Sequence, residues 1–255
     1  MSAILEDLLI AGGILALLLI ALEVGFVVGR RATTDADPRA SAAVGAVQGA
    51  ILGLLGLLLA FTFAAAGGRF LERQDLIVQE ANAIGTAYLR ADLLDEPYKS
   101  ELHAALKRYT EHRIDLSSRL RHGIEPATLA EIDRLHAGIW SAAIAGVTAK
   151  SSVMMGVLIP INEVINLHAT RLAAGRKRLP PIIMALLMAC SLLAVGVTGY
   201  VCGMGGRRRA PLPVALAFLI GAALWITVDL DSSRAGLLQL SDAPLKALKF
   251  DRLPQ

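Results

Sequence analysis

Residues 44–66 read VGAVQGAILGLLGLLLAFTFAAA, and no charged residue occurs between Arg39 and Arg69. Because a helix rises about 1.5 Å per residue, a stretch of about 25 residues crosses a hydrocarbon core about 30 Å thick. The stretch therefore predicts a membrane-spanning helix. The helical pattern continues without an evident break as far as Leu94.

Beyond Arg69 the predicted helix is amphipathic. Charged residues such as Glu72 and Asp75 lie away from its apolar face. The apolar positions that share one face are Phe70, Ile77, Ala81, Ile84, Tyr88 and Ala91. We expect a single helix that leaves the membrane and ties the region outside it to the span.

The composition indicates a membrane protein with an attached polar region. Of the 255 residues, 55% are hydrophobic and only 18% are charged, which is too apolar for an ordinary soluble domain. The net charge of +3 comes largely from arginines that flank the apolar stretches, as is typical of membrane-edge anchoring. No basic run is long enough to indicate a nucleic-acid partner, so membrane lipid is the expected contact.

Three further stretches have the length and composition of spans. They are residues 8–28, 182–201 and 212–228, the last of them somewhat short. Polar connections at 30–41 and 205–209 join the four spans in pairs, as two antiparallel hairpins.

The segment between the hairpins has the pattern of polar helices, with no strand alternation. Pro97 marks the end of the long helix, because proline disfavours helical geometry in the preceding residue. A second helix is expected from 98 to 121 and a third helical region from Pro126. Pro160 is expected to kink or interrupt this region. The apolar run 153–161 is short and is expected to pack rather than cross the membrane.

The expected fold is all-α: a polytopic membrane protein with four transmembrane helices in two hairpins and an inserted helical extramembrane domain. The first hairpin takes residues 1–66, the extramembrane domain 67–179 and the second hairpin 180–228. Residues 229–255 form a C-terminal tail that is expected to pack on the helical domain.

A stripe of small residues marks the second span. Its members, which fall within about 100° on a helical wheel, are Gly45, Gly49, Gly53, Gly56, Ala60 and Ala64. In lipid such a face allows close approach of another helix, either within one subunit or between subunits around a central axis. The opposite face carries Leu55 and Thr62. If several copies assemble, one of these two faces would line a narrow apolar constriction.

Three acids lie within the spans or at their edges. Glu23 lies inside the first span, where it either contributes to an ion path or reaches the membrane edge and pairs with Arg30. Asp229 and Asp231 follow the fourth span. They are expected to cap backbone or to pair with arginines such as Arg234, with attraction of a cation such as calcium as the alternative.

No arrangement of residues indicates an enzyme. The sequence has no Gly-x-Ser-x-Gly, phosphate-loop or Cys-x-x-Cys motif, and its five histidines form no metal-binding pattern. Asp133 and His136 lie one turn apart and are expected on a surface helix. We therefore expect no catalytic residue, no bound metal and no cofactor.

Several stretches resemble the bacterial bestrophin-like membrane-protein family, and together they cover most of the chain. They are LLGLLLAFTF at 54–63 with RF at 69–70, EANAIGTAYLRADLL at 80–94, INEVINLHATR at 161–171 with RLPP at 178–181, and VDLD at 228–231 with RAGLLQLSDAPLKAL at 234–248. The signature helix of the family includes Glu80, Asn82, Gly85, Tyr88 and Arg90. Where relatives often carry Arg-Pro after Asp-Leu-Asp, this chain has Ser232-Ser233.

The family is distantly similar to bestrophins, which are pentameric anion channels whose second span lines the pore. The resemblance therefore implies a homo-oligomer, with a pentamer as the pattern, in the bacterial inner (cytoplasmic) membrane, and small ions as its substrate. It favours a cytoplasmic helical domain, whereas six arginines in the two short connections favour an external one by the positive-inside rule.

Two functions are expected from these features. The first is an oligomeric ion channel with the second span around the axis. The alternative is a membrane-anchored scaffold or stress-response module whose helical domain binds a partner without permeation.

Overall fold

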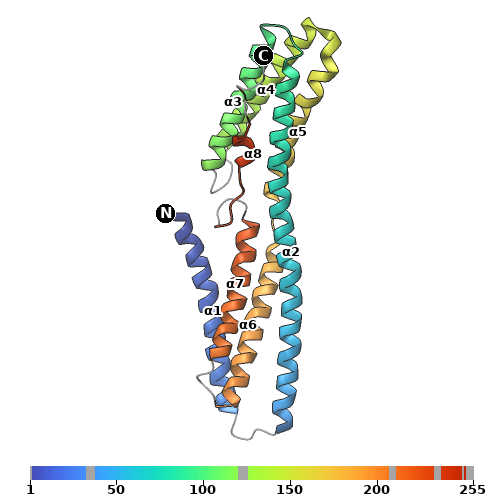
Figure 1. The fold of residues 1–255 in the computed structure, drawn as a ribbon. Helices are drawn as coiled ribbons and strands as arrows, with labels where there is room; N and C mark the ends of the chain where they lie inside the picture. Colours follow the sequence, from blue (N-terminus) through green and yellow to red (C-terminus); the bar gives the residue numbers. More distant parts are fainter. Residues whose placement is uncertain are drawn as a thin grey trace. The chain divides into compact units, whose positions relative to one another are not determined.

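The computed structural model describes residues 2–32, 38–119, 126–206, 211–232, 237–248 and 250. Within these ranges most residues are helical and no strand occurs, so the predicted all-α fold is confirmed. The helices shown in Figure 1 are α1 (Ser2–Ala32), α2 (Pro38–Ala91), α3 (Tyr98–Arg119), α4 (Pro126–Ala149), the 3-10 turn η2 (Ser151–Val153), α5 (Met154–Arg176), α6 (Pro181–Met204), α7 (Pro211–Asp231) and α8 (Ala243–Lys246).

Four helical stretches are long and apolar enough to cross a membrane, as the sequence predicts. They are Leu5–Ala32, Ala42–Ala91, Ser151–Met204 and Pro211–Asp231. Two of these stretches also contain polar helix, because α2 becomes charged from Arg69 onward and α5 carries charges that α6 lacks. The spanning parts are therefore α1, the first part of α2, α6 and α7.

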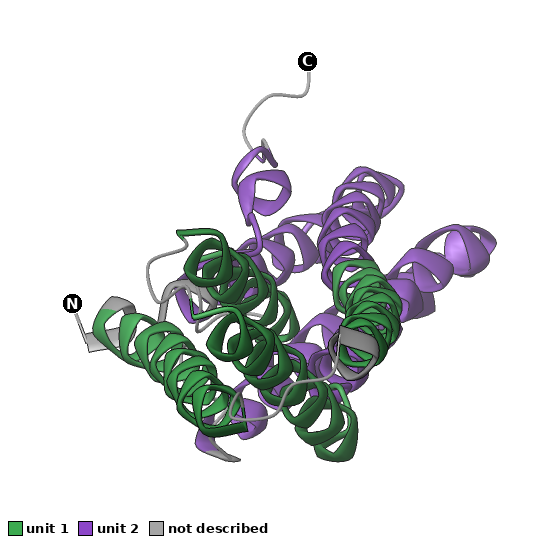
Figure 2. Ribbon diagram, turned by 90° about the horizontal axis from the view of Figure 1, so that it is seen from below, with its two compact units in different colours: residues 1–69, 178–238 green, residues 70–177, 239–255 purple. Residues whose placement is uncertain are grey.

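The chain divides into two compact units, coloured separately in Figure 2. The first comprises residues 1–69 and 178–238, and the second comprises residues 70–177 and 239–255. Helix α2 contributes to both, because it continues past residue 69 as one unbroken helix.

In the first unit, α1 packs closely on α6 through glycines. A Cβ atom at Gly25 or Gly29 of α1 would clash with the carbonyl oxygen of Gly196 or Tyr200 in α6. Gly199 of α6 approaches the backbone of α1 in the same way. Residues without a side chain allow this approach, which is the usual basis of tight helix pairing in lipid. The adjoining core consists of Ile14, Leu18, Leu55, Leu187, Ala194, Val195, Ala217, Ile220 and Leu224.

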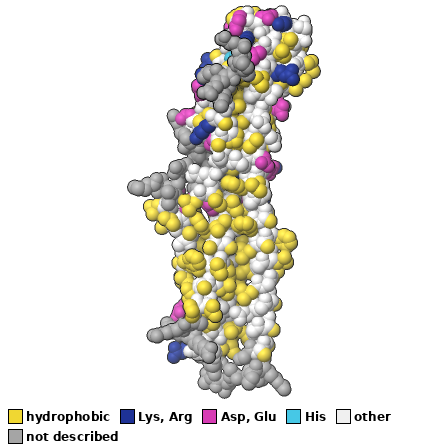
Figure 3. All heavy atoms as spheres, in the orientation of Figure 1, with side chains coloured by type: hydrophobic (Ala, Val, Ile, Leu, Met, Phe, Trp, Pro, Cys, Tyr) yellow, Lys and Arg dark blue, Asp and Glu magenta, His cyan; other side chains and the backbone are white. Residues whose placement is uncertain are grey.

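In the second unit, α2, α3, α4 and α5 enclose one hydrophobic core. The predicted apolar face of α2 supplies Ile77 and Ile84, which are both fully buried. Members from the other helices include Leu102, Leu106, Ile132, Ile139, Ile161 and, from α8, Leu245. On the face shown in Figure 3, hydrophobic side chains cover the first unit, whereas acidic and basic side chains gather over the second.

Helix α5 is not interrupted at Pro160, so of the two predicted outcomes, a kink or an interruption, the interruption is wrong. The helix continues on both sides of the proline. The ring of Pro160 is buried, and the neighbouring Val157 and Ile161 are fully enclosed in the core. This packing stabilises the helix where one backbone hydrogen bond is lost.

The connections differ from their predicted lengths. The connection predicted at 30–41 is shorter, because α1 continues to Ala32 and α2 begins at Pro38. Helix α2 ends at Ala91, slightly before the predicted end of the long helix. The arginines at 207–209 lie outside the described residues.

Candidate functional site

The small-residue face of α2 is uncovered. Gly45, Gly49, Gly53 and Gly56 are exposed. Apart from the adjoining residues and the backbone of α2 itself, no atom of the described part of the chain lies within 4 Å of a Cβ atom placed at any of these glycines. Ala60 and Ala64 are exposed as well. Close packing within one subunit, one of the two predicted uses of this face, is therefore not made by the described residues at these positions. In the first unit, the glycines that closely approach another backbone pair α1 with α6.

The opposite face of α2 is packed inside the first unit. Leu55 is 2% exposed and belongs to its core. The buried hydroxyl of Thr62 donates a hydrogen bond to the carbonyl oxygen of Leu58 at 2.7 Å. Gln48 Nε2 donates to Thr198 Oγ1 of α6 at 3.0 Å. These contacts turn the small residues outward.

Asp229, near the end of α7, holds the chain that follows the helix. Its two carboxylate oxygens accept hydrogen bonds from the backbone N–H groups of Leu237 and Leu238, both at 2.9 Å. These contacts are of the backbone-capping kind expected for this residue. Arg234 and Ser233 lie outside the described residues.

Asp231 lies two residues further on and has two kinds of partner. Its carboxylate accepts the backbone N–H of Leu179 at 3.0 and 3.1 Å and pairs with Arg69 Nε at 3.3 Å. It therefore fastens the start of the third span and the membrane edge of α2. Glu23, the third predicted acid, lies on the exposed side of α1.

A buried ionic cluster lies inside the second unit. The fully buried carboxylate of Glu80 on α2 accepts hydrogen bonds from the Tyr109 hydroxyl at 2.6 Å and from Arg113 Nε at 3.0 Å, both on α3. Arg171 of α5 forms a second ion pair with the same carboxylate. Two guanidinium groups thus compensate one buried charge, as burial requires. Burial raises the pKa of Tyr109 to about 12, so its hydroxyl keeps the donated proton.

Two histidines adjoin this cluster. His136 of α4 is 9% exposed and His168 of α5 is 8% exposed. Their ring centroids lie 5.1 Å apart, and the ring of Tyr109 lies 5.1 Å from that of His136. The predicted surface position of His136 is wrong, because α4 turns this side chain into the core. Burial, followed by the charge of Arg113, lowers the pKa of both histidines, to about 4 for His168.

Tyr88, another signature residue, contacts the C-terminal tail. Its hydroxyl donates a hydrogen bond to the carbonyl oxygen of Phe250 at 2.5 Å. Its ring stacks on His103 of α3 with centroids 3.9 Å apart. A Cβ atom at Gly85, one turn earlier, would contact Leu248 at 3.4 Å. Small size at this position gives the tail room to pack on α2.

The remaining signature residues lie on the surface. Asn82 and Arg90 are both exposed. Neither belongs to the ionic cluster, so the signature combines one buried charge, a tail contact and surface positions.

A second group of contacts ties the outer part of α2 to its neighbours. The guanidinium of Arg73, also buried, donates to the carbonyl oxygens of Ala174 and Lys177 at the end of α5. These carbonyls have no partner within the helix. Gln74 exchanges two hydrogen bonds with the backbone of Ser241 in the tail.

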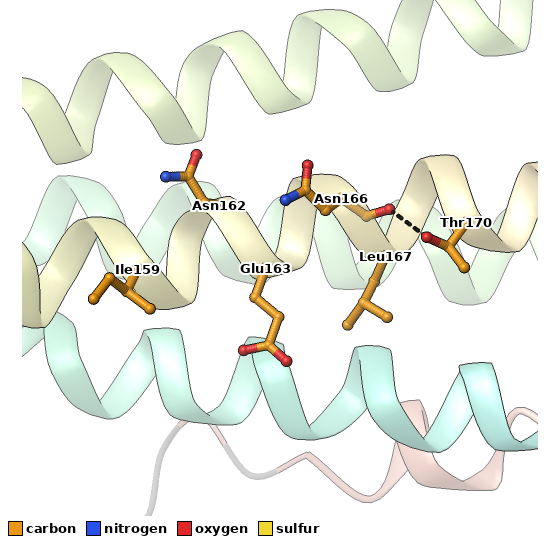
Figure 4. Close-up of a pocket in the computed structure, with 6 residues that line it drawn as sticks. All are labelled: Ile159, Asn162, Glu163, Asn166, Leu167 and Thr170. Carbon is orange, nitrogen blue, oxygen red and sulfur yellow. Dashed lines mark hydrogen bonds between the residues drawn. The ribbon is translucent and has the colours of Figure 1, made fainter.

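An open groove of about 400 Å³ follows one side of α5 (Figure 4). Its lining residues are Ile159, Asn162, Glu163, Asn166, Leu167 and Thr170. Figure 4 shows Glu163 pointing toward the neighbouring helix α2, and the Thr170 hydroxyl donating to the carbonyl oxygen of Asn166 at 3.0 Å. Glu163 is the one titratable side chain in this lining, so the groove has no acid–base pair.

The sequence alone did not reveal the partners of Glu80. Its position carries a signal, because Glu80 lies three residues after Ile77 and four before Ile84, on the apolar face of the helix. A charged residue at such a position predicts a buried pair but not its members. Across the described ranges, no three His, Cys, Asp or Glu side chains are grouped to hold a metal ion.

A comparison with known protein families gives a match. A family model described as the bestrophin-like domain matches residues 15–245, which include the α2 span, the ionic cluster and both acids after the fourth span. Neither a curated protein nor a solved structure matches the chain. Because the family match covers most of the sequence, the chain is a membrane protein that belongs to the bestrophin-like family.

Proposed function

We propose that the protein is the subunit of a homo-oligomeric ion channel in which α2 of each subunit faces a central axis. The uncovered glycine face of α2 carries this proposal, since Leu55 and Thr62 fasten the opposite face within the subunit. In lipid, packing rather than exclusion of water drives helix association, so small residues favour contact with another helix. A second copy of the chain supplies that helix.

Conduction follows from the same arrangement. Helices that present glycine and alanine toward an axis leave a narrow apolar passage, of the kind that gates by dewetting. The likeness of the family to bestrophins motivates the further proposal that small ions are the substrate, that five copies assemble and that the protein lies in the bacterial inner membrane.

The full-length chain in lipid nanodiscs provides the first test, by measurement of its assembled mass. Reconstitution in planar bilayers provides the second, by recording ionic current while pH, calcium and the anion are varied. A multimer that conducts supports the proposal. A monomer in nanodiscs, or a multimer without current under all these conditions, contradicts it. In the latter case, capture of a partner by the protein would favour the scaffold alternative.

A matched pair of variants tests the role of the α2 face. Gly53→Leu places a large side chain on the uncovered face, and Gly13→Leu does the same on α1, where the glycine is also exposed and no described atom lies within 4 Å of a Cβ position. We expect Gly53→Leu to abolish the multimer or the current and Gly13→Leu to preserve both. If the two variants behave alike, the proposal that α2 faces the central axis is contradicted.

A further inference from the structure

The buried histidine pair of the second unit faces an excess of positive charge. The rings of His136 and His168 meet edge to face, and the charge of Arg113 acts on both. Arg113 and Arg171 together bring two positive charges to the single carboxylate of Glu80. If His136 or His168 were protonated, the cluster would hold no further carboxylate to compensate the added positive charge.

One nitrogen of each histidine ring lacks a hydrogen-bond partner. His136 Nε2 and His168 Nδ1 are buried and have no hydrogen-bond partner among the described residues. Asp133, on the same helix as His136, favours its charged form, but burial and Arg113 outweigh this effect. Tyr109, which faces His136 from α3, keeps its proton for Glu80 and offers no negative charge.

We propose that His136 and His168 form an acid-sensitive latch, in which uptake of protons by the pair separates α4 and α5 from α3. Protonation in place would put a cationic ring beside Arg113 with one buried N–H that has no acceptor, whereas separation exposes both rings to water. While the helices remain packed, a charged ring repels a second charge on its neighbour. The second histidine therefore takes up its proton only once the helices separate. The latch does not depend on ion conduction and would regulate the helical domain of a channel or of a scaffold.

Trp140 offers a local reporter of this movement. It lies one turn beyond His136 on α4 and is 37% exposed, and Trp225 is the other tryptophan of the chain. In the full-length Trp225→Phe protein in nanodiscs, we expect a reversible change of Trp140 emission as the pH falls from 6.5 to about 4. Its steepness should correspond to uptake of about two protons, with faster hydrogen exchange in α4 and α5.

Variants distinguish the pair from other acid-sensitive groups. The double variant His136→Gln/His168→Gln should lose the transition, whereas His103→Gln, which changes the histidine stacked on Tyr88, should retain it. Absence of a transition in the parent protein above pH 4 would overturn the proposal. Its persistence in the double variant would also do so, since carboxylates such as Glu80 would then be responsible.

A measurement on the parent protein covers the case in which the double variant does not fold. In protein labelled at the histidine rings, NMR should show two histidines that titrate together, at the pH of the Trp140 transition. Titration of both at a higher pH, with α4 still in place, would contradict the latch.

Discussion

The carboxylate of Glu80 on α2 accepts a 2.6 Å hydrogen bond from the Tyr109 hydroxyl on α3, and both side chains are fully buried. Arg113 and Arg171 complete the shell around the same carboxylate. This cluster fixes α2 against α3 and α5 in the second unit. Helix α2 is unbroken, so the same helix carries both the uncovered glycines and Glu80.

Glu80→Gln should strongly destabilise the helical domain. The change leaves Arg113 and Arg171 buried without a compensating charge, which typically costs about 3–5 kcal/mol. Denaturant unfolding of the full-length protein, followed by far-UV circular dichroism, measures this loss. Glu163→Gln on the exposed face of α5 is the matched control and should change the free energy of unfolding by less than about 0.5 kcal/mol. Equal effects would show that the cluster contributes no special stability.

Gly25→Ala should weaken the pairing of α1 with α6. The added methyl group would meet the carbonyl oxygen of Gly196, so the two helices must move apart, at a cost of about 1–3 kcal/mol. Gly12→Ala on the same helix meets open space among the described residues and should be neutral or slightly stabilising. Thermal unfolding in detergent compares the two variants. A stable Gly25→Ala protein would mean that the helices tolerate a wider spacing.

Asp229→Asn should loosen the chain after α7 without changing any response to calcium. An amide presents one oxygen where the carboxylate accepts two backbone N–H groups, so at least one hydrogen bond to Leu237 or Leu238 is lost, at about 1–2 kcal/mol. Limited proteolysis of this segment, with calcium or with a chelator, provides the measurement. Protection of the parent protein by calcium would instead assign a cation to this edge.

The stability of the helical domain should decrease in mild acid because of His168. Its folded-state pKa of about 4 lies below the ordinary 6.5, so between these values the unfolded chain binds more protons. The stability that neutral His168 contributes to the folded state is therefore fully present above pH 6.5 and declines as the pH falls toward 4. We expect a loss of about 1 kcal/mol between pH 7 and pH 5. His168→Leu should reduce this pH dependence in denaturant titrations, and an unchanged dependence would exclude His168 as its source.

Much of the fold could be predicted because its signals are local. Charge-free stretches of sufficient length identify the spans, and the apolar face of residues 70–91 identifies the core side of α2. Pro160 shows the limit of a local rule, since buried neighbours preserve the helix around it. His136 shows another, because a histidine beside Asp133 has the pattern of a surface helix until the packing of α4 is known.

By itself, the sequence determined where helices form, which of them can span a membrane and that one span carries a stripe of glycines. Only the tertiary structure decided which glycines pack within the chain, that the described residues leave those of α2 uncovered, and that Glu80, His136 and His168 share one core. The physical reason is that length and periodicity belong to neighbouring residues, whereas a close approach or an ion pair joins residues far apart in the chain. Glu80 accepts a hydrogen bond from a tyrosine 29 positions away, and no local sequence pattern spans so many residues.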